Sequence, residues 1–298
     1  MSWRVVVVRG RCKLEYKLGY LVCRGEEVKK LFLNEISSLV VESTAVSLTA
    51  ALLSELIKNK VNILFCDENH NPVSQLLPLY GRHDCSGVLR RQLNWKEEHK
   101  SAVWTAIVRM KIKKQMEFLS ELCCPQSELL KSYVDGTELN DRTNREGHAA
   151  KVYFDALFGL SFKRGDKTFL NGALNYGYTI LLSAFNREIA GLGFNTQLGL
   201  AHKSEFNQFN LSCDLVEPFR VIVDKAVFGK DNCQFTPDFK RYLCDILNRE
   251  IKIDDKYFVV NDAIGIYAKS VFNALEDGDT SKICLLYTSP SPRDKRQS

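Results

Sequence analysis

The hydrophobic pattern of this chain changes its period once, near residue 84. Up to that point the apolar residues form short β-branched or alternating runs, such as 3–8 and 61–66, and glycines separate the early runs. Beyond it they recur every three or four residues over long stretches. A period of two is typical of strands, and a period of about 3.6 is typical of helices that bury one face. The pattern therefore predicts an α+β fold, with a small N-terminal β-rich domain followed by a larger, mostly α-helical domain.

The same pattern gives the expected elements. In the β domain, at residues 1–84, we expect strands and one helix in the order 3–8, 12–16, 19–23, 30–33, 39–41, helix 45–58, 61–66 and 73–79. The helical domain, at residues 85–283, follows a polar linker bounded by glycines. It should contain helices at 88–123, 127–133, 143–159, 171–190, 209–228, 236–250 and 261–276, with a hairpin or strand at 251–260. The β domain shows no catalytic constellation, so we expect it to serve dimerisation or partner docking.

Composition limits the class of protein. The chain has 298 residues, 45% of them hydrophobic, which is enough for a sizeable core. No run approaches the ~18 apolar residues of a membrane span, and the first residues do not resemble a signal peptide. The 10 cysteines lack the paired spacing of a zinc module, so we expect free thiols in a reducing compartment. These features predict a cytoplasmic protein without membrane contact.

The last residues differ from the rest of the chain. Residues 284–298 turn abruptly to proline, serine and charge, without any periodicity. They resemble translated sequencing-adapter sequence, and a disordered natural tail is the alternative. We therefore expect 284–298 to be a non-native tail that takes no part in the fold.

Three acidic or imidazole side chains stand out in the helical domain. His202 lies in a loop that contains Gly199, and Asp214 and Glu217 follow at a spacing that shares one helix face. Pro218 predicts a kink beside Glu217. Each feature alone is usually structural, because most loop histidines bind nothing and most such acid pairs form a solvated face. Further upstream, Glu146 opens an apolar helix, and the glycine after it allows another group to come close.

Four segments together resemble one family. They are Arg145-Glu146-Gly147, Asn171 to Tyr178, Gly199 to His202, and Asp214 to Arg220. In order and spacing they are similar to the CRISPR adaptation integrase, the metal-dependent DNase that inserts new spacers, and to its type II branch in particular. The resemblance runs from the first strands to about Lys282.

The resemblance implies a metal site and a reaction. Its ligands map onto Glu146, His202 and Glu217, which would be the catalytic residues, while Asp214 and Asn175 would support them. Two carboxylates and one imidazole, without a thiolate, suit Mg²⁺ or Mn²⁺. The family's reaction is attack by the 3′-hydroxyl of a captured DNA fragment on a phosphodiester of the repeat array, and water replaces the hydroxyl in hydrolysis.

Several basic residues are candidates for binding DNA. The expected helix 88–123 has a buried stripe at Trp104, Val108, Ile112, Met116, Leu119 and Cys123. Off that stripe lie basic residues that include Arg90, Arg91, Lys111 and Lys114, and Lys203 and Arg220 flank the acids. Such a run is either a solvated face or a track for phosphates.

The family also implies partners. They are double-stranded DNA, as spacer precursor and repeat array, a second copy of the chain in a homodimer, and a small second CRISPR adaptation protein. The type II branch adds its effector nuclease and a ring-forming DNA-end binder. Two alternatives remain open: a standalone nuclease for branched DNA that uses the same residues, and a non-catalytic DNA-binding scaffold whose acids only form salt bridges.

Overall fold

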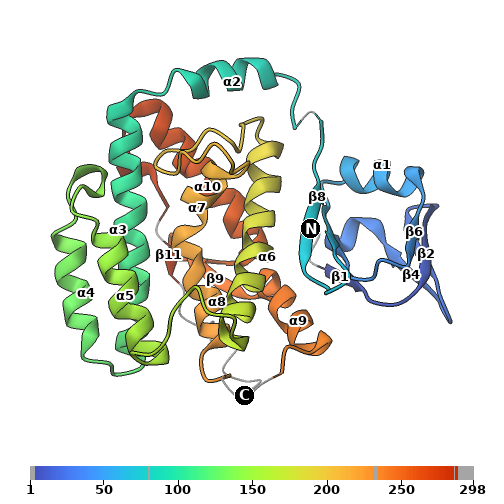
Figure 1. Ribbon diagram of the computed structural model, residues 1–298. Helices are drawn as coiled ribbons and strands as arrows, with labels where there is room; N and C mark the ends of the chain where they lie inside the picture. The colour runs from blue at the N-terminus through green and yellow to red at the C-terminus, as the bar shows by residue number, and fades with distance from the viewer. Residues whose placement is uncertain (1–3, 80, 231–233, 285, 288–298) are drawn as a thin grey trace. The chain divides into compact units, whose positions relative to one another are not determined.

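The computed structural model describes residues 4–79, 81–230, 234–284 and 286–287. These fall into two compact units, residues 1–83 with 190–192 and residues 84–189 with 193–298. The first is rich in strands and the second in helices, which confirms the predicted α+β class (Figure 1). Within the described residues, no helix combines the length and apolar character that a membrane span requires. The nine cysteines in this part of the chain are free, as predicted, and Cys233 lies outside it.

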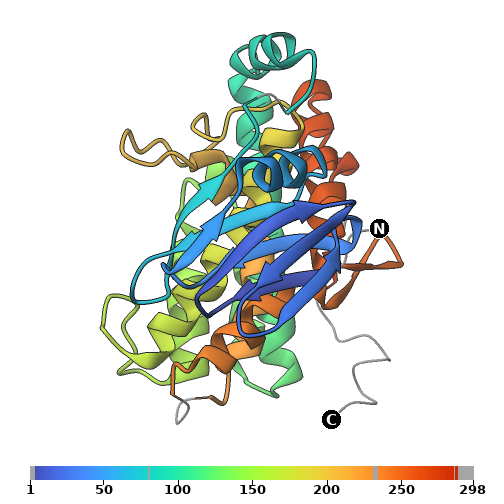
Figure 2. The same cartoon turned by 90° about the vertical axis from the view of Figure 1, so that its right-hand side faces the viewer.

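The N-terminal unit contains two four-stranded sheets, whose strands face the viewer in Figure 2. The first has the order β1 (Arg4–Val8), β5 (Ile36–Val41), β7 (Asn62–Cys66) and β8 (Pro72–Leu76). The second has the order β4 (Val28–Phe32), β3 (Tyr20–Arg24), β2 (Cys12–Lys17) and β6 (Val46–Leu48). Their apolar side chains form a core with those of helix α1 (Ala50–Lys58). A two-residue turn joins β2 to β3, and both of its residues, Leu18 and Gly19, have the positive φ that a tight hairpin requires.

One helix of this unit is shorter than the sequence predicts. We expected a helix at 45–58, but residues 46–48 form β6 and pair in parallel with β2. The helix begins only at Ala50, because the side chain of Thr49 caps it by accepting a hydrogen bond from N of Leu52 at 3.3 Å.

The helical unit is arranged around α3 (Glu97–Glu121), which packs against α4 (Gln126–Asp135), α5 (Arg145–Phe158) and α10 (Val260–Asp277) (Figure 1). The remaining helices are α2 (Cys85–Leu93), α6 (Phe169–Gly191), α7 (Asn210–Val216), α8 (Arg220–Val227) and α9 (Pro237–Cys244). Between α9 and α10, the predicted hairpin is present as β9 (Glu250–Ile253) and β10 (Lys256–Val259), which pair in antiparallel.

The single helix expected at 88–123 is two helices, α2 and α3. The second ends at Glu121, two residues before the predicted end. Cys123 lies beyond the helix with a φ of 55° and is exposed, which removes it from the predicted stripe. Met116 is only half-buried, whereas Trp104 and Leu119 are buried as predicted.

Two other expectations concern the segments near Pro218 and the C-terminus. The kink predicted at Pro218 is present, because a 3-10 turn at Glu217–Phe219 separates α7 from α8. The expectation that the fold excludes 284–298 is wrong for Leu286–Tyr287, which form β11 and pair with β9. Leu286 is 2% exposed, so burial of its side chain accounts for this pairing. Residues 285 and 288–298 lie outside the described residues, and the origin of the segment stays a prediction.

Replacing Gly177 with alanine should lower the free energy of unfolding by about 1–3 kcal/mol, the usual cost of overpacking. A Cβ on residue 177 of α6 would lie 2.5 Å from Cγ1 of Val223 in α8. The matched control is Gly172→Ala on the same helix, where a Cβ meets nothing within 4 Å. That change should raise stability by up to about 1 kcal/mol through helix propensity. Urea unfolding followed by circular dichroism measures both, and equal stability of Gly177→Ala and the wild type would contradict the tight α6–α8 contact.

Candidate active site

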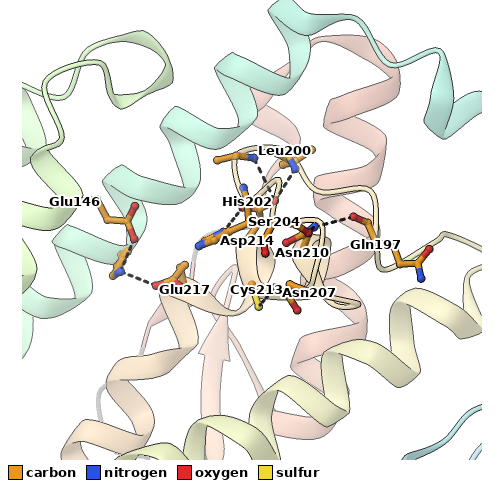
Figure 3. A network of polar contacts seen from close by, with 12 residues as sticks. Glu146, Gln197, Leu200, His202, Ser204, Asn207, Asn210, Cys213, Asp214 and Glu217 are labelled. Atoms are coloured by element: carbon orange, nitrogen blue, oxygen red, sulfur yellow. Dashed lines mark hydrogen bonds and ion pairs between the residues drawn. The ribbon is translucent and has the colours of Figure 1, made fainter. Parts of the chain in front are cut away.

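Three separate elements bring a lysine and two glutamates together. Lys111 comes from the middle of α3, Glu146 from the first turn of α5, and Glu217 from the 3-10 turn after α7. Nζ of Lys111 lies 2.6 Å from Oε1 of Glu146 and 2.6 Å from Oε2 of Glu217. No more than twice that distance therefore separates the two carboxylate oxygens. In Figure 3 the two glutamates lie on opposite sides of this shared contact, which dashed lines mark.

Glu146 is held in place by the capping of its helix. Asn144, just before α5, has a φ of 52° and accepts a hydrogen bond from N of Gly147 at 3.3 Å. The carboxylate of Asp141 accepts from N of Arg145 at 2.8 Å and from N of Glu146 at 3.0 Å. A Cβ on residue 147 would lie 2.7 Å from Oδ1 of Asn144. The close approach predicted beside this glycine is therefore made by the capping side chain.

Burial and charge together set the protonation of Glu217. Its side chain is only 5% exposed, and Oε1 accepts from Nε of Arg220 at 2.9 Å. Burial raises the pKa of Glu217, but the charges of Lys111 and Arg220 outweigh it and bring that pKa to about 2. Burial lowers the pKa of Lys111, and the two glutamates outweigh that effect and raise it. Glu217 and Lys111 are therefore both charged at neutral pH.

The loop that carries His202 is folded around the buried carboxylate of Asp214. Oδ2 accepts from N of Leu200 at 2.5 Å and from N of Ala201 at 3.3 Å, while Oδ1 accepts from N of His202 at 3.1 Å. Nδ1 of His202 lies 2.7 Å from Oδ1, and because a carboxylate only accepts, this nitrogen donates. The hydrogen bond to Asp214 raises the pKa of His202, although burial opposes it. A Cβ on Gly199 would lie 2.8 Å from Oδ2, so the loop requires glycine there.

The side chains around Lys111 fit a divalent cation in their chemistry. The ammonium of Lys111 stands between two carboxylates as a cation that both already share. His202 is 43% exposed and uses Nδ1 for Asp214, which leaves Nε2 as the nitrogen that a metal would take. In the described part of the chain, no three His, Cys, Asp or Glu side chains already form a ready ligand group. Figure 3 shows Glu146, His202 and Glu217 in one region. The ion pairs place Lys111 between the two glutamates.

The predicted DNA-binding residues differ in exposure. Arg90, Arg91 and Lys203 are exposed, and Arg91 pairs with Glu276 at 3.2 Å. Lys114 is 2% exposed and pairs with Glu117 on its own helix at 2.7 Å. The prediction that Lys114 lies on a solvated phosphate track is therefore wrong, because α3 is covered on that side too.

Lys111 and Arg220 are also not free surface cations, because both are paired with buried Glu217. Asn175 is exposed on α6. Its Oδ1 accepts a hydrogen bond from Nη2 of Arg164 at 2.7 Å, so its side chain is bonded to this arginine and not to the glutamates. Arg164 was not among the named candidate site residues, although the basic loop 161–170 that contains it was expected to lie near substrate. Its guanidinium lies 5.5 Å from the ring centre of Tyr178, and that of Arg220 lies 4.7 Å from the same ring.

A buried acid behind this ring was also missed. Asp224 of α8 accepts hydrogen bonds from the hydroxyls of Tyr178 and Tyr153, the latter at 2.9 Å. Burial raises the pKa of Asp224 to about 6, although the two hydrogen bonds oppose the shift. The only signal in the sequence is an aspartate within an apolar helix, which does not identify its partners.

Changing Asp214 to asparagine should cost about 3 kcal/mol or more of stability. An amide cannot accept from all the donors that the carboxylate serves, and hydrogen bonds to a charged group contribute about 1.5–3 kcal/mol each. Chemical unfolding measures the loss, and nitrogen NMR of labelled histidine should show Nδ1 of His202 protonated in the wild type. The exposed Asp135→Asn is the control. A variant with wild-type stability and an unchanged His202 signal would contradict the role of Asp214.

Asp224 should make stability fall as pH rises from about 4 to about 6. Its pKa is about 6 in the folded chain against 3.8 ordinarily, so over this interval the folded state binds more protons than the unfolded state. The integrated loss is about 3 kcal/mol. It should be absent from Asp224→Asn, so the stability difference between wild type and variant should shrink or reverse toward pH 7. Unfolding curves measured at successive pH values check this, and parallel pH profiles would count against it.

Comparisons with known proteins bear on the whole chain. A family model described as CRISPR associated protein Cas1 matches residues 5–241. A protein named CRISPR-associated endonuclease Cas1, from Neisseria meningitidis serogroup C (strain 8013), is 33% identical over 295 residues, which cover 96% of each chain. A CRISPR-associated endonuclease Cas1 1 from Francisella tularensis subsp. novicida (strain U112) is 26% identical over 235 residues, covering 70% of this chain and 73% of that protein.

Solved structures share the fold. A casposase bound to its integration product has a TM-score of 0.77 at 18% identity, covering 100% of this chain and 98% of that one. A CAS1 protein from Thermotoga maritima has a TM-score of 0.73 at 17% identity, covering 91% and 97%. At these identities the likeness concerns the fold alone. Together, the family model and the similarity to the Neisseria protein show that this chain belongs to the CRISPR associated protein Cas1 family.

Proposed function

We propose that this chain is a metal-dependent DNA endonuclease and integrase of CRISPR adaptation, of the type II branch, and that it inserts short DNA fragments into the repeat array. The observation that carries the proposal is the shared cation between Glu146 and Glu217, beside a histidine that Asp214 orients. Family membership supports the reaction class, and the name of the Neisseria relative supports endonuclease activity.

Glu146, His202 and Glu217 are the residues that would hold Mg²⁺ or Mn²⁺. When bound, the cation would supply charge stabilisation for a phosphodiester under attack. Asp214 keeps the proton of His202 on Nδ1, so that Nε2 presents a lone pair. Arg220 partly neutralises Glu217 and fixes its orientation through Oε1. Among the basic residues, the exposed Arg90, Arg91 and Lys203 would meet DNA phosphates, and Arg164, which is bonded to Asn175, would contribute a further positive charge.

The proposed reaction is a transesterification. The 3′-hydroxyl oxygen of the incoming fragment bonds to the scissile phosphorus, the bond from phosphorus to the array's 3′-oxygen breaks, and a proton passes through solvent from the attacking to the leaving oxygen. Water in place of the hydroxyl gives hydrolysis. No covalent intermediate with the protein is needed, because positioning and electrostatic stabilisation supply the catalysis.

The proposed partners follow from the relatives. One solved structure of similar fold is a Cas6-RT-Cas1--Cas2 complex, which supports assembly with a small second adaptation protein. The casposase of similar fold is bound to an integration product, which supports integration as the reaction of this chain, and a TtCas1–DNA complex of similar fold supports DNA as its substrate, which we take to be double-stranded. A homodimer, contact with the type II effector nuclease and a ring-forming DNA-end binder, and a cytoplasmic location belong to the same proposal.

Strand transfer tests the proposal directly. A short duplex with free 3′-hydroxyl ends is incubated with a repeat-containing plasmid, Mn²⁺ and the small partner protein. His202→Ala and Glu217→Ala should each lower transfer by about a hundredfold or more while DNA binding persists, because loss of a ligand should cost at least as much as loss of an outer-shell partner. The control Glu128→Ala removes an exposed glutamate on α4 and should retain full transfer.

The same assay separates the alternatives. Cleavage of branched DNA that needs Glu217 but neither the partner nor a 3′-hydroxyl would favour a standalone nuclease. Binding that is indifferent to metal and to both mutations, without any transfer, would favour a scaffold. Full transfer by either variant would mean that the site is elsewhere.

A further inference from the structure

Lys111 is an unusual lysine for a nucleic-acid enzyme, because it is paired inside the protein. Its side chain is 11% exposed, and its partners Glu146 and Glu217 come from two elements remote from α3 in the sequence. A lysine that binds phosphate normally presents its ammonium to solvent as a point charge. Here the ammonium takes up the place between the two carboxylates.

Burial of a lysine on α3 does not by itself require such partners. Lys114, on the next turn, is 2% exposed and is paired with Glu117 three residues along its own helix. A buried ammonium on this helix can therefore pair with a carboxylate of the same helix. The long-range pairing of Lys111 is specific to the site, which makes Lys114 a matched comparison.

We infer that Lys111 is a resident counter-ion, which holds Glu146 and Glu217 together before a metal arrives and leaves them when a divalent cation and DNA bind. The inference rests on the metal site proposed above. Lys111 is thus a positioning residue in the metal-free protein and a phosphate ligand in the loaded one.

Charge balance supports this exchange. In the cluster, Lys111 and Arg220 carry two positive charges, and Glu146 and Glu217 carry two negative ones, all within ion-pair distances. A divalent cation added to this neutral cluster would leave an excess of two positive charges, of which the carboxylate of Asp214 behind His202 would offset only one. Two changes relieve the excess: the ammonium moves off the carboxylates, and an anion enters. The flexible four-carbon stem of lysine permits the first, and a DNA phosphate supplies the second.

The exchange makes metal binding and DNA binding mutually dependent. Without DNA, Mn²⁺ must compete with the ammonium for the same oxygens. With DNA, the displaced ammonium gains a phosphate partner, so each ligand raises the affinity for the other. The measurable consequence is a Mn²⁺ affinity that rises when a duplex is added.

The test measures Mn²⁺ binding to the full chain by electron paramagnetic resonance, with and without a short duplex. In Lys111→Met the competitor is gone, so Mn²⁺ should bind about tenfold more tightly than in the wild type without DNA, and the duplex should enhance binding less. The metal-free variant should melt at a lower temperature than the wild type, because two carboxylates lose their shared cation. Added Mn²⁺ should raise the melting temperature of the variant and so remove this difference. Lys114→Met is the control and should leave Mn²⁺ affinity unchanged.

A second variant keeps the inference testable if Lys111→Met does not fold. In Lys111→Arg the guanidinium remains charged and can contact both carboxylates through its fork, so Mn²⁺ should bind more weakly than in the wild type. Unchanged or weaker Mn²⁺ binding in Lys111→Met, or wild-type binding in Lys111→Arg, would overturn the inference.

Failure of the inference differs from failure of the metal site. If wild-type Mn²⁺ binding is lost in Glu217→Ala but is indifferent to Lys111, only the counter-ion role is wrong. If Mn²⁺ binding is not reduced by Glu217→Ala, the proposed metal site itself is wrong.

Discussion

The ion pairs around Glu217 are the interaction on which the helical unit depends. A carboxylate that is 5% exposed cannot remain charged in a protein interior unless cations lie beside it, and Lys111 and Arg220 provide them. Lys111 also reaches Glu146, so one cluster ties α3, α5 and the turn after α7 together. Removing Lys111 would leave the buried Glu217 with Arg220 alone of these two cations, and Glu146 without the ammonium that it shares. Packing of this unit and the chemistry of its site therefore rest on the same charges.

Asp214 satisfies backbone hydrogen-bond donors of a loop that has no regular secondary structure. The loop before α7 has backbone donors that no helix or strand satisfies, and this buried carboxylate accepts several of them together with the imidazole of His202. The two acids of the Asp214–Glu217 pair therefore have different roles: Asp214 holds the loop, and Glu217 forms ion pairs. The turn that begins at Glu217 directs its side chain toward α3, while Asp214 remains on α7 and faces the loop.

Much of the fold was predictable because it depends on local patterns. The period of the apolar residues predicted the strand-rich and helix-rich units and most of their elements, and Pro218 predicted the break between α7 and α8. Errors occurred where local signals compete. Residues 46–48 have apolar spacing compatible with helix, but pairing with β2 makes them a strand. Lys111 and Lys114 look like a solvated face in sequence, and other helices cover α3 on nearly every side.

The sequence by itself determined the fold class, the apolar helix that Glu146 opens, the kink at Pro218, and the set of candidate ligands through its resemblance to a family. Each of these depends on residues close together in the chain or on a motif that can be recognised there. Only the tertiary structure decided which charges meet. That Lys111 stands between Glu146 and Glu217, that Asp214 serves the loop, and that Asp224 lies beneath two tyrosines all depend on helices packing across long separations. Such contacts have no local signature, because burial and partner choice are set by the packed helices together.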